Sequence, residues 1–354
     1  MRRVASGSVP SRLAEQTTLR LGGPPSRLVT ADSQAALVAA VRAADAAGEA
    51  LLLIGGGSNV VVADAGWPGV AVLVRSGGIE WTPGAAPGTV LVTAQAGVRW
   101  DELVELTIAR GWSGLASMSG IPGSVGATPV QNVGAYGSEV ADTIAGLTVL
   151  DRQSGQLASW SPEQCGFGFR SSAFKHTDRY VVLDVTFLLE VSELAAGVRY
   201  LELARRLGVE PGQRPPSSKV REVVLELRAS KGMLLDADDH DTWSVGSFFT
   251  NPVVSQADLD RLQGRSDGPV PHFPAPDGVK LAAAWLVEHA GFGKGFPGPQ
   301  ASATLSTKHS LALTNRGTAT ARDVVALARV VRDGVHDAFG ITLIPEPVLV
   351  GVTI

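Results

Sequence analysis

Apolar residues along the first part of the chain recur at spacings that predict alternating helices and strands. Residues from Leu37 to Ala44 follow helical spacing, between a capping Asp32 or Ser33 and a terminating Gly48. The continuous apolar run at 51–54 is typical of a buried strand. The same patterns predict strands at 60–62, 70–74, 90–96, 144–151 and 180–190, the last central in its sheet, and a helix at 100–110.

A proline-rich stretch at 211–217 marks the clearest domain boundary. An amphipathic helix through Val220 and Leu227 follows, and then Lys231 and an acidic loop at 236–241. Beyond this loop the apolar spacing predicts a second unit. It has helices at 258–262, 280–290 and 320–339 and strands at 309–315 and 341–350.

The stretch at 119–137 resembles no ordinary helix or strand. Gly120, Gly123 and Gly126 occupy every third position, which removes side chains that would keep a partner from the backbone and permits positive φ angles. Gly134 and Gly137 form a second close turn. Such a loop suits a polyphosphate or a flat polar ring lying on main chain. The alternative is a surface turn, but the interleaved valines and isoleucine are not typical of a solvated linker.

A second glycine turn, at 55–59, directly follows a predicted strand. Its position suits phosphate binding, but the third glycine of the dinucleotide fingerprint is missing and no Gly-Lys-Ser or Gly-Lys-Thr follows. The turn therefore belongs to neither motif. The two glycine turns bracket one αβ unit, and both can face one long cofactor.

Composition narrows the class of protein. A chain of 354 residues with 45% hydrophobic and 18% charged residues predicts two or three compact units with an ample core. The net charge of −4 gives no basic patch for nucleic acid. Cys165 is the single cysteine, which excludes an internal disulfide and a thiolate metal cluster and fits a reducing cytoplasm.

Metal binding and membrane insertion are not expected. The six histidines are scattered, without ligand spacing, so no metal site is predicted. No apolar run follows Arg2 and Arg3 as in a signal peptide, and no later run reaches the ~18 residues of a membrane span. We therefore expect a soluble cytoplasmic protein.

Three polar residues in apolar surroundings are candidates for chemistry. Arg170 lies among small and aromatic residues and can hold a carboxylate, although such an arginine is more often packed through its stem. Ser247 stands between Gly246 and a phenylalanine, where the alternative is an incidental serine at a strand entrance. Glu346 lies between two prolines, which restrict its backbone.

Six segments carry a resemblance to a known family. They read LLLIGGGSNVVV, GLASMSGIPGSVGATPVQNVGAYGSEV, FGFRSSAFK, GSFFTNPV, VKLAAAWLVE and IPEPVLVG in chain order. Together they resemble the UDP-N-acetylenolpyruvoylglucosamine reductase family of peptidoglycan precursor synthesis, over about residues 17–353. Tyr200 further resembles the tyrosine of the subtype whose extra segment closes over the substrate.

The resemblance implies an α+β fold with two domains. An FAD-binding domain of the vanillyl-alcohol-oxidase/PCMH type is expected at 17–230, in two α/β subdomains at about 17–80 and 81–230. The last strand, at 341–354, is a candidate to return to it. A substrate-binding α+β domain is expected at 231–340.

The family also implies roles for individual residues. FAD is expected to bind non-covalently, and NADPH to donate the hydride, which passes to C3 of the enolpyruvyl group of UDP-N-acetylglucosamine enolpyruvate. Arg170 and Glu346 match the residues that hold the carboxylate and stabilise the enolate, and Ser247 matches the proton donor to C2. The implied cofactor-binding residues are Gly55, Gly56, Gly57, Ser58, Asn59, Ser119, Gly120, Ile121, Pro122, Gly123, Ser124, Gly126, Ala127 and Gly134. The implied substrate contacts are Tyr136, Tyr200, Lys231, Asn251 and Lys280.

The chain departs from the family pattern at two places. Phe169 precedes Arg170 where many relatives have tyrosine, which removes one hydroxyl, and the connection from Lys231 to Ser247 is longer. Two other functions are compatible with the glycine turns alone. A flavin oxidase of the same broad fold would lack the set of Arg170, Ser247 and Glu346, and an inactive nucleotide-binding protein would have lost at least one of them. We expect a monomeric enzyme.

Overall fold

The computed structural model describes residues 11–266 and 268–354, which form two compact units. We call Arg27–Gly57 with Gly69–Leu234 the sheet unit, and residues 11–26 with Ser58–Pro68 and Leu235–Ile354 the C-terminal unit. The predicted FAD-binding and substrate-binding domains are functional divisions and stay predictions. The two compact units divide at residue 234, close to the predicted boundary at 230. Residues 58–68, which were expected in the FAD-binding domain, lie in the C-terminal unit, and so do residues 341–354.

The sheet unit is built on an antiparallel sheet with β12 (Tyr180–Val191) near its centre. The strand order is β11-β10-β12-β6-β5, from β11 (Gln156–Trp160) and β10 (Ile144–Asp151) to β6 (Thr89–Gln95) and β5 (Ile79–Pro83). The short β7 (Trp112–Ser113) pairs with the end of β12. Val181 to Val185 in β12 are mostly buried, which confirms the central strand predicted from its apolar run.

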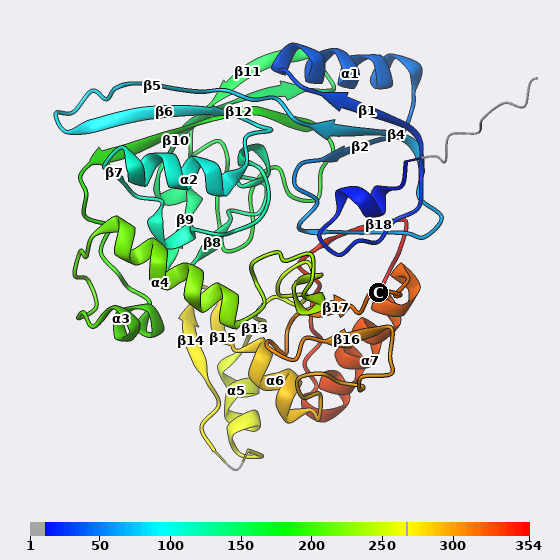
Figure 1. Ribbon diagram of the computed structural model, residues 1–354. Coiled ribbons are helices and arrows are strands. Elements are labelled where there is room, and N and C mark those ends of the chain that lie inside the picture. The colour runs from blue at the N-terminus through cyan, green and yellow to red at the C-terminus, as the bar shows by residue number, and fades with distance from the viewer. Residues whose placement is uncertain (1–10, 267) are drawn as a thin grey trace, which may run out of the picture. The chain divides into compact units, whose positions relative to one another are not determined.

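A smaller sheet has the order β1-β4-β2, formed by β1 (Pro25–Ala31), β4 (Trp67–Val74) and β2 (Leu51–Ile54). Helix α1 (Gln34–Ala47) covers it (Figure 1), with Leu37, Val41 and Ala44 packed against the valines of β4. The side chain of Ser33 accepts a hydrogen bond from the amide of Ala36, and Gly48 ends the helix at a φ of 65°. Both predicted caps are confirmed.

The remaining helices of the sheet unit pack near the glycine-rich stretch. Helix α2 (Trp100–Ala109) buries Trp100 against Phe187 of β12, with ring centroids 5.9 Å apart. Helices α3 (Leu201–Leu207) and α4 (Ser217–Ser230) share an apolar cluster with Ala116. Short elements complete the unit: η2 (Ala116–Met118), η3 (Val125–Ala127), β8 (Gly134–Ala135), β9 (Ser138–Glu139) and η4 (Val140–Asp142).

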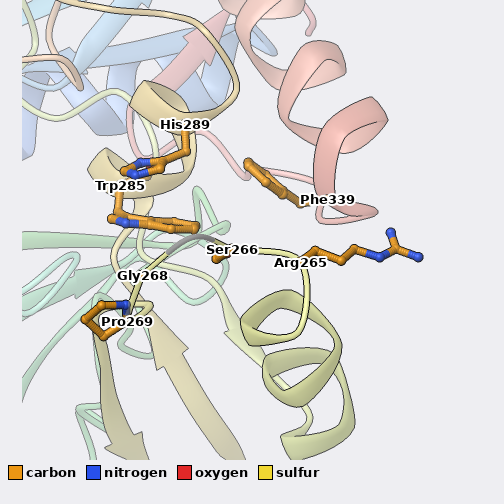
Figure 2. Close-up of a pocket in the computed structure, with 7 residues that line it drawn as sticks. All are labelled: Arg265, Ser266, Gly268, Pro269, Trp285, His289 and Phe339. Carbon is orange, nitrogen blue, oxygen red and sulfur yellow. The ribbon is translucent and has the colours of Figure 1, made fainter.

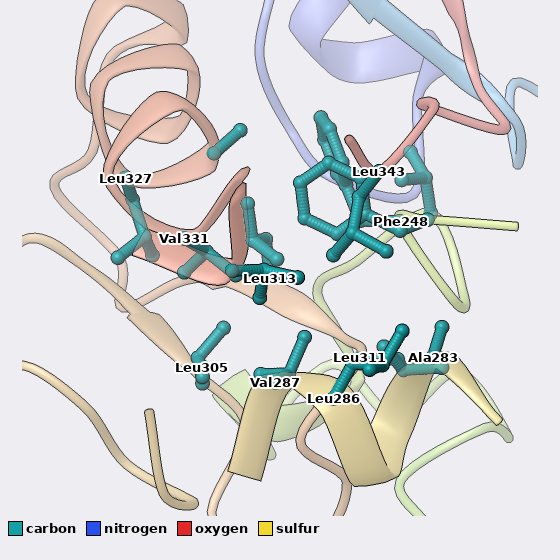
Figure 3. Packing of buried hydrophobic residues seen from close by; sticks show 14 of the residues in the cluster. Phe248, Ala283, Leu286, Val287, Leu305, Leu311, Leu313, Leu327, Val331 and Leu343 are labelled. Atoms are coloured by element: carbon teal, nitrogen blue, oxygen red, sulfur yellow. The ribbon is translucent and has the colours of Figure 1, made fainter. Parts of the chain in front are cut away.

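The C-terminal unit surrounds one apolar cluster. Helices α6 (Ala283–His289) and α7 (Ala321–Phe339) pack there against the paired strands β16 (Ala303–Leu305) and β17 (Leu313–Asn315), as Figure 3 shows for Leu286, Leu305, Leu313 and Val331. A further sheet has the order β13 (Val253–Val254), β15 (Gly278–Leu281) and β14 (His272–Ala275). The other elements are η1 (Leu13–Gln16), η5 (His240–Thr242) and α5 (Gln256–Gln263).

The last strand joins distant parts of the sequence. Strand β18 (Val348–Val350) pairs in parallel with β3 (Val60–Val62), in the register of Leu349 with Val61. The residues at 58–68 belong to the C-terminal unit, which agrees with this pairing.

Three predicted elements are wrong in extent. The helix predicted at 280–290 begins at Ala283, because Lys280 is hydrogen-bonded within β15 between β13 and β14. The strand predicted at 309–315 is confined to 313–315, because 306–309 form a turn. The strand predicted at 341–350 is confined to 348–350, because Pro345 and Pro347 cannot donate to a ladder.

Among the described residues, no helix combines the length and apolarity needed to cross a bilayer. The prediction about a signal peptide falls largely on residues 1–10, which lie outside the described residues.

Candidate active site

Within the sheet unit, residues 55–57 of the shorter glycine turn pack directly against the longer glycine turn. A Cβ atom on Gly56 would lie 2.5 Å from the Cα of Gly123, and one on Gly55 would collide with the hydroxyl of Ser124. Gly57, Gly120 and Gly123 adopt φ angles of 63°, 71° and 126°. These glycines are therefore required by close approach and by left-handed backbone, and the two turns form one surface of main chain.

The amide groups of the longer turn divide into two sets. Those of Gly120, Gly126 and Ala127 donate to Asp101 Oδ1 and to the carbonyls of Ala96 and Ser124. Among the described residues, the structure gives no acceptor to the amides of Ile121, Gly123 and Ser124. Adjacent amides of this kind in a glycine turn are suited to phosphate oxygens, so these residues fit the pyrophosphate of FAD.

Other implied cofactor residues have structural partners. The hydroxyl of Ser119 donates to the carbonyl of Ala116 at 2.7 Å, and the carbonyl of Gly134 accepts from Arg170. Ser58 and Asn59 lie in the C-terminal unit, where the carbonyl of Asn59 accepts from the amide of Val348.

Arg75 supports the shorter glycine turn and was not found from the sequence. Its Nη1 donates to the carbonyls of Gly55 at 2.8 Å and Val74 at 2.9 Å. Partial burial lowers the pKa of this guanidinium. Its only sequence signal is an arginine placed directly after a buried strand.

Arg170 has an unusual backbone that its neighbours hold in place. Its φ is 50°, in the left-handed region that non-glycine residues rarely adopt. The guanidinium donates to the carbonyls of Gly134 at 2.7 Å and Asn132 at 3.4 Å, while Lys175 Nζ donates to the carbonyl of Arg170. The adjoining Phe169 is exposed, and the Arg170 Cζ lies 5.5 Å from its ring centroid. The loop that carries Arg170 is thus tied to the second half of the glycine-rich stretch.

Three implied substrate contacts lie around helices α3 and α4. The rings of Tyr136 and Tyr200 meet edge to face with centroids 5.6 Å apart. Burial raises the pKa of Tyr136 to about 12, so its hydroxyl is neutral and can donate. Lys231 forms an ion pair with Glu202 at 2.7 Å. Tyr136, Tyr200 and Lys231 are therefore brought to one region of the sheet unit.

Arg228 is a second residue that sequence reasoning missed. It lies one turn before Lys231 on α4, and its Cδ would be 3.3 Å from a Cβ placed on Gly120. Its Nη2 donates to the carbonyl of Met233, whereas its Nε is buried with no hydrogen-bond partner among the described residues. Burial lowers the pKa of this guanidinium. An arginine of this kind beside a glycine turn favours an anionic ligand.

The C-terminal unit brings Ser247 and Glu346 onto paired segments. The amide of Glu346 donates to the carbonyl of Phe248 at 2.8 Å, and the amide of Thr250 donates to the carbonyl of Ile344 at 3.0 Å. The hydroxyl of Ser247 lies 3.4 Å from Nε2 of His309. Both implied catalytic residues of this unit are partly exposed, so a ligand can reach them.

Asn251 and Lys280 lie in the same unit. The Oδ1 of Asn251 accepts from the amide of Ala283 at 2.9 Å, at the start of α6, which gives this residue a capping role. Lys280 stands in β15 opposite Val253 and Phe273. Ser247, Glu346, Asn251 and Lys280 thus belong to the C-terminal unit, whereas Arg170, Tyr136, Tyr200 and Lys231 belong to the sheet unit.

A pocket of about 540 Å³ in the C-terminal unit contains none of the predicted site residues. Trp285 and His289 stack there with ring centroids 3.9 Å apart, and Phe339 faces them (Figure 2). Arg265, Ser266, Gly268 and Pro269 complete its lining, and none of these residues matches a role implied above.

Comparisons with known proteins match both parts of the chain. Residues 25–160 match a family of FAD-binding domains, and residues 238–350 match the C-terminal domain of UDP-N-acetylenolpyruvoylglucosamine reductase. Two curated reductases of that name, from Mycobacterium sp. (strain MCS) and Salinispora arenicola (strain CNS-205), are each 56% identical to it. The alignments cover 97% and 96% of this chain and 95% and 94% of theirs.

A solved structure supports the fold. The crystal structure of the reductase from Thermus caldophilus matches with a TM-score of 0.63 at 24% identity, over 96% of this chain and 97% of that chain. The fold, the match to FAD-binding domains and the curated relatives together define this chain as an FAD-dependent oxidoreductase with a separate C-terminal domain. The chain belongs to the UDP-N-acetylenolpyruvoylglucosamine reductase family.

Proposed function

We propose that this chain reduces UDP-N-acetylglucosamine enolpyruvate to UDP-N-acetylmuramate at the expense of NADPH, in peptidoglycan precursor synthesis. Whole-length identity to reductases of that name supports the substrate. The observation that carries the proposal is the main-chain bond from Glu346 to Phe248, which sets Glu346 beside the segment of Ser247. We further propose a cytoplasmic monomer.

The glycine turns are the proposed holders of the cofactor. FAD, bound non-covalently, would take a hydride from NADPH and supply it to C3 of the enolpyruvyl group. The amides of Ile121, Gly123 and Ser124 support this role because they are oriented in a turn that tolerates close approach. Gly55 to Asn59 would contribute the second side of the pyrophosphate site, and Arg75 would keep that turn in shape.

Ser247 is the proposed proton donor to C2. A serine hydroxyl is a very weak acid, so it can protonate carbon only when the carbon bears developing negative charge and that charge is held elsewhere. Arg170 and Glu346 are proposed to bind the substrate carboxylate and to stabilise the enolate. The two carbonyl contacts of Arg170 support this role because they fix the plane of its guanidinium.

The remaining contacts are proposed for the sugar nucleotide. Tyr136, Tyr200 and Lys231 lie in the same part of the sheet unit as Arg228, whose buried Nε has no hydrogen-bond partner among the described residues, and such a guanidinium suits the negative charge of a diphosphate. Asn251 and Lys280 are proposed to contact the same substrate. The Nδ2 of Asn251 can donate while its Oδ1 caps α6.

The test is an anaerobic stopped-flow experiment on the purified protein. Flavin absorbance is followed first on addition of NADPH and then on addition of the enolpyruvyl sugar nucleotide. We expect bleaching and then rapid recovery. Absence of flavin from the protein, or recovery with oxygen alone, would contradict the proposal and favour a flavin oxidase or an inactive binding protein.

A further inference from the structure

The acidic segment at 236–241 has no role in the proposed chemistry, yet one of its carboxylates is deeply embedded. Asp241 is 5% exposed and accepts hydrogen bonds from the amide of Thr307 at 2.9 Å and from its hydroxyl. Arg316 Nη1 donates to the same carboxylate at 2.9 Å. Burying a carboxylate is costly unless its lone pairs are used, so these bonds fix Thr307 firmly.

Thr307 belongs to a tight turn between β16 and β17. Within the turn, the hydroxyl of Ser306 accepts from the amides of Lys308 at 3.0 Å and His309 at 3.3 Å. Lys308 forms an ion pair with Asp239 of the same acidic segment. The segment therefore holds the turn at two successive residues, Thr307 and Lys308.

The turn ends at His309, which faces the proposed proton donor. Nε2 of His309 is 3.4 Å from Oγ of Ser247. The two segments are also joined by the amide of Phe248, which donates to the carbonyl of Leu311 at 2.8 Å. Phe248 and Leu311 belong to the apolar cluster of this unit (Figure 3), so the pair is held on packed main chain.

If Ser247 is the proton donor, the hydrogen bond between Ser247 and His309 can have only one direction. A hydroxyl has one hydrogen and two lone pairs, while a neutral imidazole nitrogen either donates or accepts. If Ser247 donated its hydrogen to His309, that hydrogen would be directed away from the substrate. When Nε2 of His309 carries a hydrogen and donates it to Oγ, the serine hydrogen is left available for C2.

We propose that His309 is a positioning residue that donates from Nε2 to Ser247 Oγ and thereby directs the serine hydrogen toward the substrate carbon. Asp241 holds the turn that places His309. This inference rests on the proposed function, in which Ser247 protonates C2. No additional reactant is needed, since the hydrogen bond changes orientation and leaves the proton balance of the reaction unaltered.

The test compares His309→Leu with His309→Gln in the holoenzyme, since the glutamine amide can donate from nearly the same place. Reduced enzyme is mixed anaerobically with the enolpyruvyl sugar nucleotide, in H₂O and in D₂O. We expect His309→Leu to slow flavin reoxidation about tenfold, the effect of one lost hydrogen bond, and to raise the solvent isotope effect. His309→Gln should recover most of the rate, and both should keep the wild-type rate of flavin bleaching by NADPH.

Three results separate the possibilities. An unchanged reoxidation rate in His309→Leu overturns the inference. It is also overturned if His309→Gln is as slow as His309→Leu and shows the same solvent isotope effect as the wild type. If Ser247→Ala keeps the full reoxidation rate, the proposed donor itself fails. Should His309→Leu lose its flavin, His309→Asn takes its place, because its shorter amide cannot reach Oγ, and the same outcomes apply. Asp241→Asn should also slow flavin reoxidation, as His309→Leu does.

Discussion

The carboxylate of Asp101, in the first turn of α2, accepts a hydrogen bond from the amide of Gly120 at 2.6 Å. The same carboxylate forms a two-pronged ion pair with Arg221 of α4, at 2.6 and 2.9 Å. One side chain therefore fixes the start of the glycine-rich loop to two helices. Burial opposes ionisation of Asp101, but the bonds from Arg221 and Gly120 outweigh it and lower its pKa.

Asp101→Asn should lower the free energy of unfolding at pH 7 by about 1–2 kcal/mol, because the partly exposed pair with Arg221 loses its charge. The folded-state pKa of Asp101 is depressed, so its contribution is present above the unfolded value of about 3.9 and is lost as the pH falls. Urea unfolding at several pH values tests this. If the difference in free energy of unfolding between variant and wild type stays constant down to pH 3, the lowered pKa of Asp101 is contradicted.

Gly56→Ala should abolish tight flavin binding, because its Cβ would lie 2.5 Å from the Cα of Gly123 and the two turns would have to separate. Gly77→Ala is the matched control, since a Cβ there meets nothing within 4 Å and its φ is not positive. The ratio of flavin absorbance to protein absorbance after purification measures the effect. Equal flavin content in the two variants would show that the packed turns do not form the cofactor site.

Ser247→Ala should slow the sugar half-reaction by roughly 10² or more, the scale of a lost general acid, while flavin reduction by NADPH stays nearly intact. Single-turnover absorbance measurements distinguish the two half-reactions. Ser255→Ala serves as a control for the loss of a hydroxyl in the same unit, because Ser255 caps α5. Parallel loss of both half-reactions in Ser247→Ala would indicate a structural role instead.

Lys231→Ala should raise the KM for the sugar nucleotide about tenfold, as expected for a lost charged contact of about 1.4 kcal/mol, with little change in melting temperature. Its pair with Glu202 is partly exposed and adds little stability. Lys219→Ala, which breaks an exposed pair with Glu222 on the same helix, should leave both KM and melting temperature unchanged. A substrate role for Lys231 would be excluded by identical KM values in the two variants.

Local patterns predicted most elements, because local physics determines them. The caps at Ser33 and Gly48, the central β12 and the long α7 ending at Gly340 all follow from side chains near in sequence. Lys280 was placed in a helix because KLAAAWLVEHA has helical spacing. Its pairing with Phe273 and Val253 is a tertiary interaction that the spacing does not contain.

Motif resemblance predicted the individual residues of the candidate site. It did not predict the hydrogen bonds that connect them. Ser247 and Glu346 are far apart in sequence, and the main-chain bond that aligns their segments depends on the fold of the C-terminal unit. His309, Arg75 and Arg228 were missed for the same reason, since each acquires its significance from a partner distant in the chain or from burial.

The pairing of β18 with β3 affects the order in which the molecule can be assembled. The sheet unit is complete once residue 234 has been synthesised, whereas residues 11–26 and 58–68, which are made before that point, belong to the C-terminal unit. The segment at 58–68 must wait for its parallel partner at 348–350, which is synthesised almost 300 residues later. Contacts so distant in sequence form slowly. During synthesis, therefore, Val60–Val62 keeps an unpaired strand edge long after its neighbours have folded, and this edge is where premature association with another nascent chain would begin.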